Sequence, residues 1–502
     1  MDLLTLLEMV ASGMGDRTLI GGRDEGITGS QLRRRAAVGG ALIGDSGAST
    51  VIYLGGNGPA FPVALFSSAA AHTPFLPLNY RLSDEQLIEI IARQDSSLLI
   101  ADDLDRAARI APDTPRISVT DFLARSATDE ESVDITPGDT DEIAVLLMTS
   151  GTTAAPKSAV LRHSHLTSYI LSSVEYASAE ESAATIVSVP PYHIAAVANL
   201  LSNLYAGRRI VYLDHFTPRQ WLDTVVDEEI TNAMVVPTML SRIVRELQDS
   251  GETVPGTLRA ISYGGAKVTA SVVRDALQLF PETGFVNAYG LTETSSTIAV
   301  LGPEDHRAAL ESDDPAVRAR LGSVGRALPG VEIEIHDELG SPMTTGTTGY
   351  IMVRGPQVAG EYLEGGSRLD KDGWFPTKDR GYMDDEGFIF VEGRADDTII
   401  RGGENIAPAE IEDVIVEHPQ VLECAVAGIP DEEWGHRIAA FVVLKSGMEL
   451  DSDELRGYVR ERLRSSKTPD FVTFLPELPE TQTGKILRRV LISEFTQTQA
   501  SA

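Results

Sequence analysis

The sequence predicts an α/β fold: a large N-terminal domain of parallel-sheet α/β subdomains with a small β-barrel, followed by a small α+β domain. Short apolar runs alternate with helix-like segments through most of the chain, the order that builds parallel sheets. From Ala327 onward, short strands with glycine turns follow one another closely. After Arg394, a segment of mixed strands and helices is long enough to form its own domain.

The expected strands of the parallel sheets are short apolar runs, as buried strands usually are. They span residues 50–54, 97–101, 143–148, 185–189, 209–213 and 233–236. Between them, residues 84–93 and 217–228 carry apolar side chains at helical spacing. A strand followed by a helix and another strand predicts parallel pairing.

The later strands are closely spaced, which predicts the small barrel from residues 331–336, 349–353 and 387–392. The C-terminal domain is expected to contain two helices and three strands. These span residues 407–418, 421–428, 437–444, 451–463 and 471–474. We place the domains at residues 1–395 and 396–502, with a boundary near Asp396.

Charge and cysteine content exclude several classes of protein. The 502 residues carry 42 Lys+Arg and 74 Asp+Glu, a net charge of −32 that repels nucleic acid. Cys424 is the single cysteine, so no intrachain disulfide can form, and its apolar surroundings predict burial. We find no signal-peptide pattern and no membrane span, and we expect a cytoplasmic protein.

A hydroxyl-rich loop follows the apolar run 143–148. Hydroxyls, backbone N–H groups and a lysine on such a loop can bind phosphate oxygens. Its candidate residues are Thr149, Ser150, Gly151, Thr152, Thr153 and Lys157. The spacing is not that of the G-x-x-x-x-G-K-[ST] phosphate loop, and taken alone the cluster favours a polar surface loop.

A second segment places a carboxylate, Glu293, beside the hydroxyl of Thr292. One carboxylate together with triphosphate oxygens can hold Mg²⁺. The alternative is that a threonine caps a helix, and taken alone the two interpretations are even. The residues just before this pair are Asn287, Ala288, Tyr289 and Gly290.

Five further positions could carry chemistry. Asp379 can accept both hydroxyls of a ribose and Arg394 can add a donor, although a turn residue and a surface charge are the plain alternatives. Gly402 and Gly403 allow close approach of a ligand, or simply mark a loop that enters a helix. Lys485 on a glycine loop is by itself a solvated charge.

The ordered set of motifs changes this interpretation. From residue 77 to Lys485 the chain resembles the adenylate-forming superfamily, in its acyl-CoA synthetase branch of fatty-acid- or aryl-CoA ligases. The resemblance implies ATP, Mg²⁺ and coenzyme A as cofactors and a mobile C-terminal domain that rotates about Asp396.

The resemblance also implies a role for each motif. The loop from Thr149 to Lys157 would wrap the β- and γ-phosphates of ATP. Tyr289 would stack on adenine, Thr292 would contact the α-phosphate and Glu293 would reach Mg²⁺. The segment between adenine and the acyl pocket is implied to be Gly264, Gly265 and Ala266.

The remaining roles concern the ribose and the acyl group. Asp379 and Arg394 are implied to bind the ribose, and Lys485 to catalyse adenylation. Gly402 and Gly403 would line the pantetheine tunnel after rotation. His193 would gate the acyl pocket, although a structural histidine is the interpretation that the residue alone favours.

We therefore expect an AMP-forming acid–thiol ligase that makes an acyl-adenylate from a carboxylic acid and ATP and then transfers the acyl group to CoA. Residues 192–197 hold no aspartate to pair with an amine, which predicts an unaminated, apolar acid. Ala195, Ala196 and Val197, with Val235 and Val236, would line its pocket.

Two alternatives stay open. One is an acyl-AMP ligase that loads a carrier protein, and the other is a degenerate member limited to one half-reaction or to binding. Ala154, Ser158 and Lys378 stand where the family usually has glycine, which keeps the second alternative open. The sequence does not choose between a monomer and a homodimer.

Overall fold

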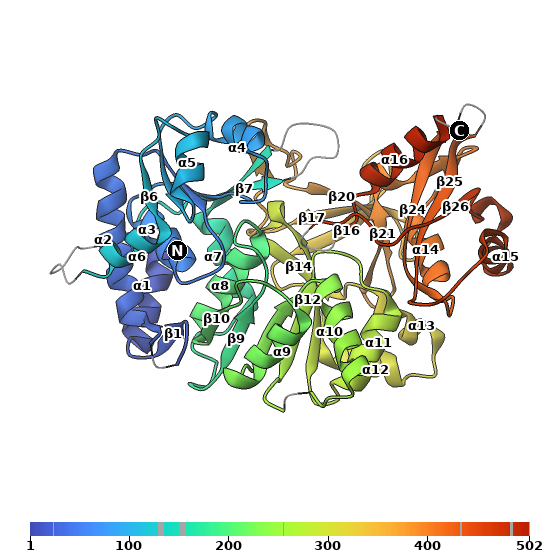
Figure 1. Ribbon diagram of the computed structural model, residues 1–502, viewed down its shortest axis with the longest axis horizontal. Helices are drawn as coiled ribbons and strands as arrows, with labels where there is room; N and C mark the ends of the chain where they lie inside the picture. Colours follow the sequence, from blue (N-terminus) through green and yellow to red (C-terminus); the bar gives the residue numbers. More distant parts are fainter. Residues whose placement is uncertain are drawn as a thin grey trace.

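The computed structural model describes residues 1–23, 25–128, 135–149, 157–254, 256–431, 434–481 and 485–500. Figure 1 shows the chain running from blue at one end of the long axis to red at the other. The C-terminal elements form the red end, and a small sheet lies between them and the rest. No helix in these ranges is long and apolar enough to cross a bilayer.

An eight-stranded sheet forms the first layer, in the order β19-β18-β8-β7-β4-β3-β5-β6. The five strands from β7 to β6 pair in parallel, whereas β8, β18 and β19 pair antiparallel. The strands are β3 (Thr50–Leu54), β4 (Phe75–Pro77), β5 (Ser97–Ala101), β6 (Arg116–Ser118), β7 (Ile143–Thr149), β8 (Lys157–Arg162), β18 (Glu361–Tyr362) and β19 (Gly366–Ser367).

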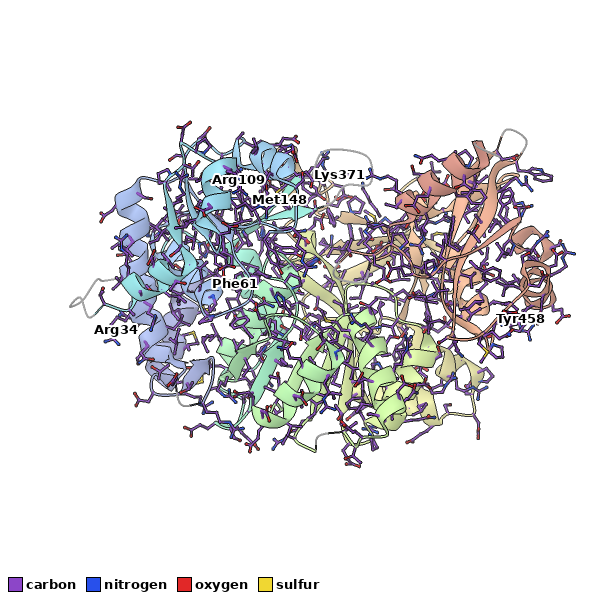
Figure 2. All side chains as sticks on the ribbon, in the orientation of Figure 1. Arg34, Phe61, Arg109, Met148, Lys371 and Tyr458 are labelled. Atoms are coloured by element: carbon purple, nitrogen blue, oxygen red, sulfur yellow. The ribbon has the colours of Figure 1, made fainter. Side chains whose placement is uncertain are left out.

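Both faces of this sheet are buried, as its parallel part requires. Val51 and Tyr53 belong to the main core, whereas the alternate residues Ile52 and Leu54 belong to a second cluster on the other face. The accompanying helices are α1 (Leu3–Met14), α2 (Gly29–Ser46), α3 (Ala60–Ala70), α4 (Asp84–Ile91), α5 (Leu104–Ile110) and α6 (Val119–Ser126). Phe61 of α3 is fully buried, and Figure 2 shows it within the N-terminal part, with Arg34 near the edge.

A nine-stranded sheet forms the second layer, in the order β15-β14-β13-β12-β11-β9-β10-β1-β2. Its six central strands, from β13 to β1, are parallel. The strands are β1 (Thr18–Ile20), β2 (Ile27–Thr28), β9 (Ala184–Val187), β10 (Arg209–Tyr212), β11 (Asn232–Val235), β12 (Ala260–Gly264), β13 (Gly284–Leu291), β14 (Ser296–Leu301) and β15 (Arg326–Ala327).

The helices of this second layer connect its strands and share one continuous apolar core with the first sheet. They are α7 (His163–Ser173), α8 (Ile194–Ala206), α9 (Pro218–Asp227), α10 (Pro237–Ser250), α11 (Ala270–Leu279), α12 (Pro303–Glu311) and α13 (Pro315–Ala319). The short helices η1 (Thr292–Thr294) and η2 (Arg320–Gly322) complete it.

The expected small β-barrel is an open sheet in the described residues, which corrects that prediction. The order is β16-β17-β20-β21, all antiparallel. The strands are β16 (Glu332–His336), β17 (Gly349–Arg354), β20 (Phe375–Met383) and β21 (Ile389–Arg394). Four strands are too few to close around packed side chains. The sheet instead buries one face against Ile298 and Ala299 of β14.

The C-terminal elements form a separate α+β unit with its own core on both faces of one sheet. Its strands are β22 (Ile399–Arg401), β23 (Glu404–Ile406), β24 (Val421–Asp431), β25 (Gly435–Leu444) and β26 (Phe471–Phe474). Its helices are η3 (Ala395–Asp397), α14 (Pro408–Val416), α15 (Ser452–Arg462), η4 (Ser465–Lys467) and α16 (Arg488–Ala500). Cys424 is buried there as expected.

Candidate active site

The segment predicted to hold adenine and a metal ion is a sharp turn at the end of a parallel strand. β13 carries Asn287, Ala288, Tyr289 and Gly290, and η1 follows at once with Thr292 and Glu293. β14 then returns antiparallel beside β13, so closely that a Cβ on Gly290 would run into the carbonyl oxygen of Ser296. Only glycine allows this approach, which holds the turn tight.

The neighbouring strand, β12, brings the predicted segment of Gly264, Gly265 and Ala266 to the same edge. Gly264, the last residue of β12, lies opposite Ala288 in the parallel ladder, and Gly265 and Ala266 follow it. Because β12 and β13 run in the same direction, their carboxyl ends meet at one edge of the sheet. Asn287 is tied down there by a 3.2 Å hydrogen bond from its Nδ2 to the carbonyl of Ser323.

Asp379 is the buried centre of the site, with 5% of its surface exposed. It lies on β20 directly opposite Arg394 on β21, and Nη1 of Arg394 is 3.2 Å from Oδ1. The hydroxyl of Tyr289, which comes from a different sheet, donates to Oδ2 at 2.6 Å. The two sheets therefore meet at this carboxylate.

Opposing effects act on the charge of Asp379. Burial raises the pKa of Asp379 above the ordinary value of an aspartate. The guanidinium of Arg394, the Tyr289 hydroxyl and the ammonium of Lys485 each oppose that rise in pKa. Lys485 belongs to the C-terminal unit, and its charge therefore acts on a carboxylate of the N-terminal part.

Lys485 is exposed, and its backbone is hydrogen-bonded to Thr481. Its N–H donates to Oγ1 of Thr481 at 3.0 Å, and the N–H of Thr481 donates to the carbonyl of Lys485 at 2.8 Å. Their neighbours Glu480 and Ile486 form an antiparallel bridge. The backbone of Lys485 is thus fixed while its side chain stays in solvent.

The predicted phosphate-binding loop is described only at its two ends. Thr149 and Lys157 face each other across the β7–β8 ladder, and Oγ1 of Thr149 donates to the carbonyl of Lys157 at 3.3 Å. The candidate residues between them, Ser150, Gly151, Thr152 and Thr153, lie outside the described residues. The Lys157 ammonium lies 5.6 Å from the ring centre of Tyr362.

Glu293 is suited to a metal ion that arrives with its own oxygen ligands. The hydroxyl of Tyr362 donates to Oε1 of Glu293. Within the described ranges, no three acidic or histidine side chains gather to form a metal cage. A single carboxylate beside a phosphate site fits Mg²⁺, which usually takes one or two carboxylates and completes its shell with water and phosphate.

His193 lies at the start of α8, where burial lowers its pKa to about 4. It is therefore neutral near pH 7. Its ring is 5.8 Å from that of Tyr192, which in turn packs edge-on against Tyr80. Val197, Val235 and Val236, in the sequence-predicted pocket segments, are buried.

The glycines predicted to meet the thiol arm form the tip of the β22–β23 hairpin. Gly402 and Gly403 have φ angles of 56° and 84°, a backbone region that favours glycine. The N–H of Gly402 donates to the carbonyl of Trp434 at 2.8 Å. Asp396 lies in η3, where the chain enters the C-terminal unit.

The structure thus brings part of the predicted site together through direct contacts. Tyr289, Asp379 and Arg394 form one group, and Lys157 and Glu293 form a second through Tyr362. The guanidinium of Arg394 pairs with Asp379, and its charge also opposes the rise that burial causes in the pKa of Tyr362, so the two groups interact electrostatically. The ring of His193 lies against Tyr192 and the N–H of Gly402 donates to Trp434, so these contacts lie outside both groups.

Sequence reasoning missed Tyr362 and Glu364. Tyr362 contacts residues 69 and 205 positions away, and local patterns carry no signal for such pairs. Glu364 accepts hydrogen bonds from both the N–H and the hydroxyl of Ser158, one of the positions where the family usually has glycine. The serine is therefore accommodated by a partner from elsewhere in the chain.

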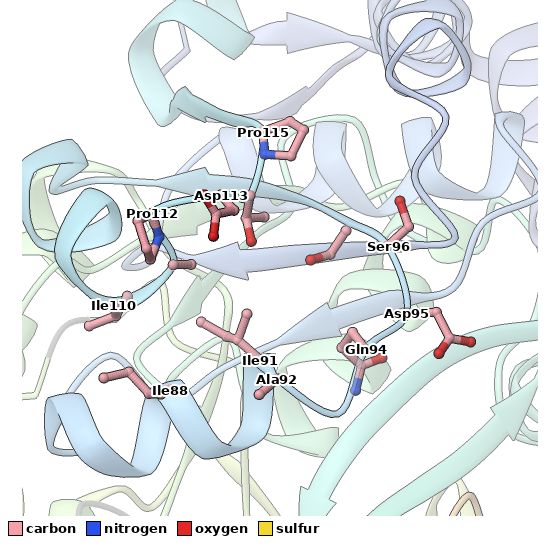
Figure 3. Close-up of a pocket in the computed structure, with 13 residues that line it drawn as sticks. Ile88, Ile91, Ala92, Gln94, Asp95, Ser96, Ile110, Pro112, Asp113 and Pro115 are labelled. Carbon is pink, nitrogen blue, oxygen red and sulfur yellow. The ribbon is translucent and has the colours of Figure 1, made fainter.

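A surface groove of about 380 Å³ lies elsewhere, between the end of α4 and the segment from α5 to β6. Figure 3 shows Ile88 and Ile91 on one wall and Pro112 and Asp113 on the other. None of the predicted site residues lines it. This groove is not the site described above.

Comparisons with known proteins identify the family to which the chain is similar. A family described as AMP-binding enzyme matches residues 7–363, and the AMP-binding enzyme C-terminal domain matches residues 410–485. A feruloyl-CoA synthase from Amycolatopsis sp is 34% identical over 445 residues, 87% of each chain. The fatty acid–[acyl-carrier-protein] ligase ScoC from Streptomyces coeruleorubidus is 31% identical over 464 residues, 89% of this chain and 86% of that one.

Solved structures share the whole fold. O-succinylbenzoate coenzyme A synthetase from Bacillus subtilis, in complex with ATP and a magnesium ion, superposes with a TM-score of 0.81 and 27% sequence identity. The match covers 96% of this chain and 98% of that one. The resemblance therefore extends over both the N-terminal part and the C-terminal unit.

Proposed function

The chain belongs to the AMP-binding enzyme family, and we propose that it is an AMP-forming acid–thiol ligase. It activates a carboxylic acid with ATP to an acyl-adenylate and pyrophosphate, and then transfers the acyl group to CoA with release of AMP. The observation that carries this proposal is the buried Asp379, which Tyr289 and Arg394 hold, while the charge of Lys485 from the C-terminal unit also acts on its pKa.

The nucleotide binds at that carboxylate. Ionised Asp379 offers acceptor oxygens to the two ribose hydroxyls, and Arg394 keeps it charged in a buried place. Tyr289 and the Gly264–Ala266 segment lie at the adjoining sheet edge, where an adenine ring fits. The Tyr289 hydroxyl, which now donates to Asp379, stays beside the sugar.

In the first half-reaction a substrate carboxylate oxygen attacks the α-phosphorus, and the bond to pyrophosphate breaks. Negative charge grows on the phosphoryl oxygens, and Lys485 and Thr292 donate to them. Lys157 and the loop that it ends hold the outgoing phosphates. Mg²⁺ held by Glu293 neutralises triphosphate charge when it is bound.

In the second half-reaction a thiol sulfur attacks the acyl carbonyl of the adenylate, and AMP leaves with the bonding electron pair. The thiol needs the space that Lys485 occupies. We propose that the domain of residues 396–502 rotates about Asp396 relative to residues 1–395. This motion withdraws Lys485 and presents the Gly402–Gly403 turn to the pantetheine arm.

The acyl pocket supports an unaminated, apolar acid. Its sequence-predicted lining at the start of α8 and the end of β11 is small and apolar, and no aspartate lies in residues 192–197. His193 is neutral at physiological pH, because burial lowers its pKa to about 4. It can orient the acid by hydrogen bonding without adding charge to the pocket.

The acceptor has two candidates. Coenzyme A is the first, in keeping with the feruloyl-CoA synthase relative, and a cytoplasmic location would supply both ATP and CoA. An acyl-carrier protein is the second, because the ScoC relative is named for that acceptor.

Pyrophosphate release with Mg-ATP, measured over fatty, aromatic and polycyclic acids, tests the proposal. Each acid is assayed with CoA, with a carrier protein and with neither. We expect acid-dependent release that becomes multiple-turnover with CoA, and acyl-CoA in the mass spectrum. Turnover that requires the carrier protein would select the second acceptor. If the folded protein releases pyrophosphate with none of the acids in the panel, the ligase assignment is contradicted.

A further inference from the structure

A short segment of chain lies beside β8, next to the Lys157 end of the proposed phosphate-binding loop. We call residues 361–364 the strap. It arrives from far along the sequence and joins the first sheet through β18, where Tyr362 pairs antiparallel with Ala159 of β8. β8 begins at Lys157, so the strap lies directly beside the residue that ends the phosphate loop.

Tyr362 contacts both charged groups that the proposed function assigns to the triphosphate. Its hydroxyl donates to the Glu293 carboxylate, and the face of its ring lies 5.6 Å from the Lys157 ammonium. Burial and the adjacent Glu293 raise the pKa of Tyr362, so the hydroxyl stays protonated and remains a donor. One side chain therefore holds an anion at its tip and a cation on its face.

The rest of the strap is fastened to β8 on both sides of Tyr362. Glu361 makes a bidentate ion pair with Arg162, with N···O distances of 2.9 and 3.2 Å. The N–H of Leu363 donates to the carbonyl of Ser158 at 2.9 Å. Glu364 accepts from the Ser158 N–H at 2.9 Å and from its hydroxyl at 2.8 Å.

Ser158 and Glu364 form a matched pair. Ser158 is 3% exposed, so its hydroxyl needs a hydrogen-bond partner within the protein. The glycine that is usual at this position has no hydroxyl to donate to Glu364. The two hydrogen bonds to one carboxylate fix the backbone directly after Lys157.

We propose that Tyr362 is a positioning residue that sets Glu293 and Lys157 for the triphosphate of ATP, and that the Ser158–Glu364 pair holds Tyr362 in place. The proposal rests on the proposed function. Lysine and glutamate side chains at a polar site tend to pair with each other directly. Tyr362 gives each of them a separate partner, so both charges stay directed and do not have to be reorganised when the nucleotide binds.

Calorimetric titration with two nucleotides tests this without measuring turnover. Mg-ATP reaches Glu293 and Lys157, whereas AMP reaches only the Asp379 group. Tyr362→Phe keeps the ring and removes the hydroxyl, and we expect it to weaken Mg-ATP binding about tenfold. Tyr362→Leu also removes the ring face and should weaken it about threefold more. AMP binding should change less than about twofold in both variants.

Controls separate positioning from general damage. Tyr382→Phe makes the same chemical change on β20. The Tyr382 ring stacks on Phe390, with the ring centres 4.7 Å apart, and takes no part in the strap contacts. This variant should bind both nucleotides like the wild type. Glu364→Gln should weaken Mg-ATP binding, and less so in a Ser158→Gly background, where the hydroxyl partner is already gone. Thermal melting verifies that each variant is folded.

The outcomes separate this proposal from the proposed function. Wild-type protein that binds neither nucleotide would contradict the ATP site itself. Wild-type binding of both, with Tyr362→Phe and Glu364→Gln unchanged for Mg-ATP, would overturn the positioning role alone. Equal losses for Mg-ATP and AMP would also overturn it, because a triphosphate effect must spare AMP.

Discussion

At the residue scale, Lys378 has an unfavourable backbone conformation, whereas the neighbouring Asp379 is stabilised by polar contacts. Lys378 adopts a φ of 65°, in the left-handed region where a side chain is strained. Asp379, next to it, is buried, and three polar groups oppose the rise in pKa that its burial causes. The strain at one residue lies beside the proposed ribose-binding group at the other.

Lys378→Gly should stabilise the protein. Relief of the left-handed strain contributes about 1–2 kcal/mol, and the extra freedom of glycine in the unfolded chain offsets about 0.5–1 kcal/mol of it. We expect the free energy of unfolding to rise by about 0.5 kcal/mol, measured by urea denaturation. Lys371→Gly is the matched control at an exposed lysine of ordinary φ, and it should lower that free energy. Equal shifts in both variants would contradict the strain.

Asp379 should make nucleotide affinity sensitive to acid. Because burial raises its pKa above the ordinary 3.8, protonation begins at a higher pH than for an exposed aspartate. The protonated group loses an acceptor oxygen, so AMP affinity should fall as the pH is lowered from neutral. The sign for stability is the reverse. The contribution of Asp379 to the free energy of unfolding is fully present below the pKa of the unfolded state. It is lost as the pH rises through the pKa of the folded state.

Asp379→Asn provides the control for that titration. We expect AMP binding at neutral pH to weaken about 10- to 100-fold, because charge-assisted hydrogen bonds to the ribose are lost. The decline of AMP affinity with acid should flatten in the variant. Calorimetry across the pH range measures both. An unchanged acid dependence in Asp379→Asn would assign the titration to another group.

At the element scale, the ion pair between Lys267 and Asp413 joins the loop after β12 to α14 at 2.7 Å. It connects the N-terminal part to the C-terminal unit in the arrangement that brings Lys485 near Asp379. Both side chains are about half exposed, so the pair contributes up to about 1 kcal/mol and is weakened by salt.

Charge reversal at this contact should act on adenylation more than on thiolation. Lys267→Glu should slow single-turnover adenylation up to about fivefold and leave thiolation of supplied acyl-adenylate unchanged. Lys267→Glu with Asp413→Lys should restore the adenylation rate. Arg259→Glu breaks an exposed pair with Glu180 inside the N-terminal part and serves as the control. Loss of both half-reactions, or no rescue by the double variant, would contradict the interpretation.

The elements also show which parts of the structure could be predicted. The apolar runs 50–54 and 97–101 became β3 and β5 with the expected parallel pairing, because burial on both faces writes a continuous apolar signal. β20 was missed because two of its inward residues, Thr377 and Asp379, are polar. Because polar residues of the proposed site stand at buried positions, β20 lacks the alternation of apolar and polar residues that identifies a strand.

The candidate site also contains residues that could be predicted from the sequence and one that could not. The resemblance pointed to Tyr289, Asp379 and Arg394, and the structure brings these three side chains into contact. It could not point to Tyr362, whose two-residue strand β18 lies between β19 and the distant strand β8. Such short strands depend on tertiary contacts more than on local propensity.

At the scale of the whole molecule, two units meet at one reaction centre. The N-terminal part supplies the proposed ribose and phosphate groups on three sheets, and the C-terminal unit supplies Lys485, whose backbone hydrogen-bonds to Thr481. Each unit has its own apolar core, so the smaller one can move without unfolding. The net charge of −32 also suits this division, because the anionic substrates are held by individual residues rather than by a basic surface.

The most direct test of this account is Lys485→Ala, with the two half-reactions measured separately. We predict that acid-dependent pyrophosphate release falls about 10²–10³-fold, since one donor to the developing phosphoryl charge is lost. Thiolation of supplied acyl-adenylate should stay near the wild-type rate, because the lysine has left the site by then. Loss of both half-reactions together, or of neither, would contradict the role of Lys485 and the rotation that carries it.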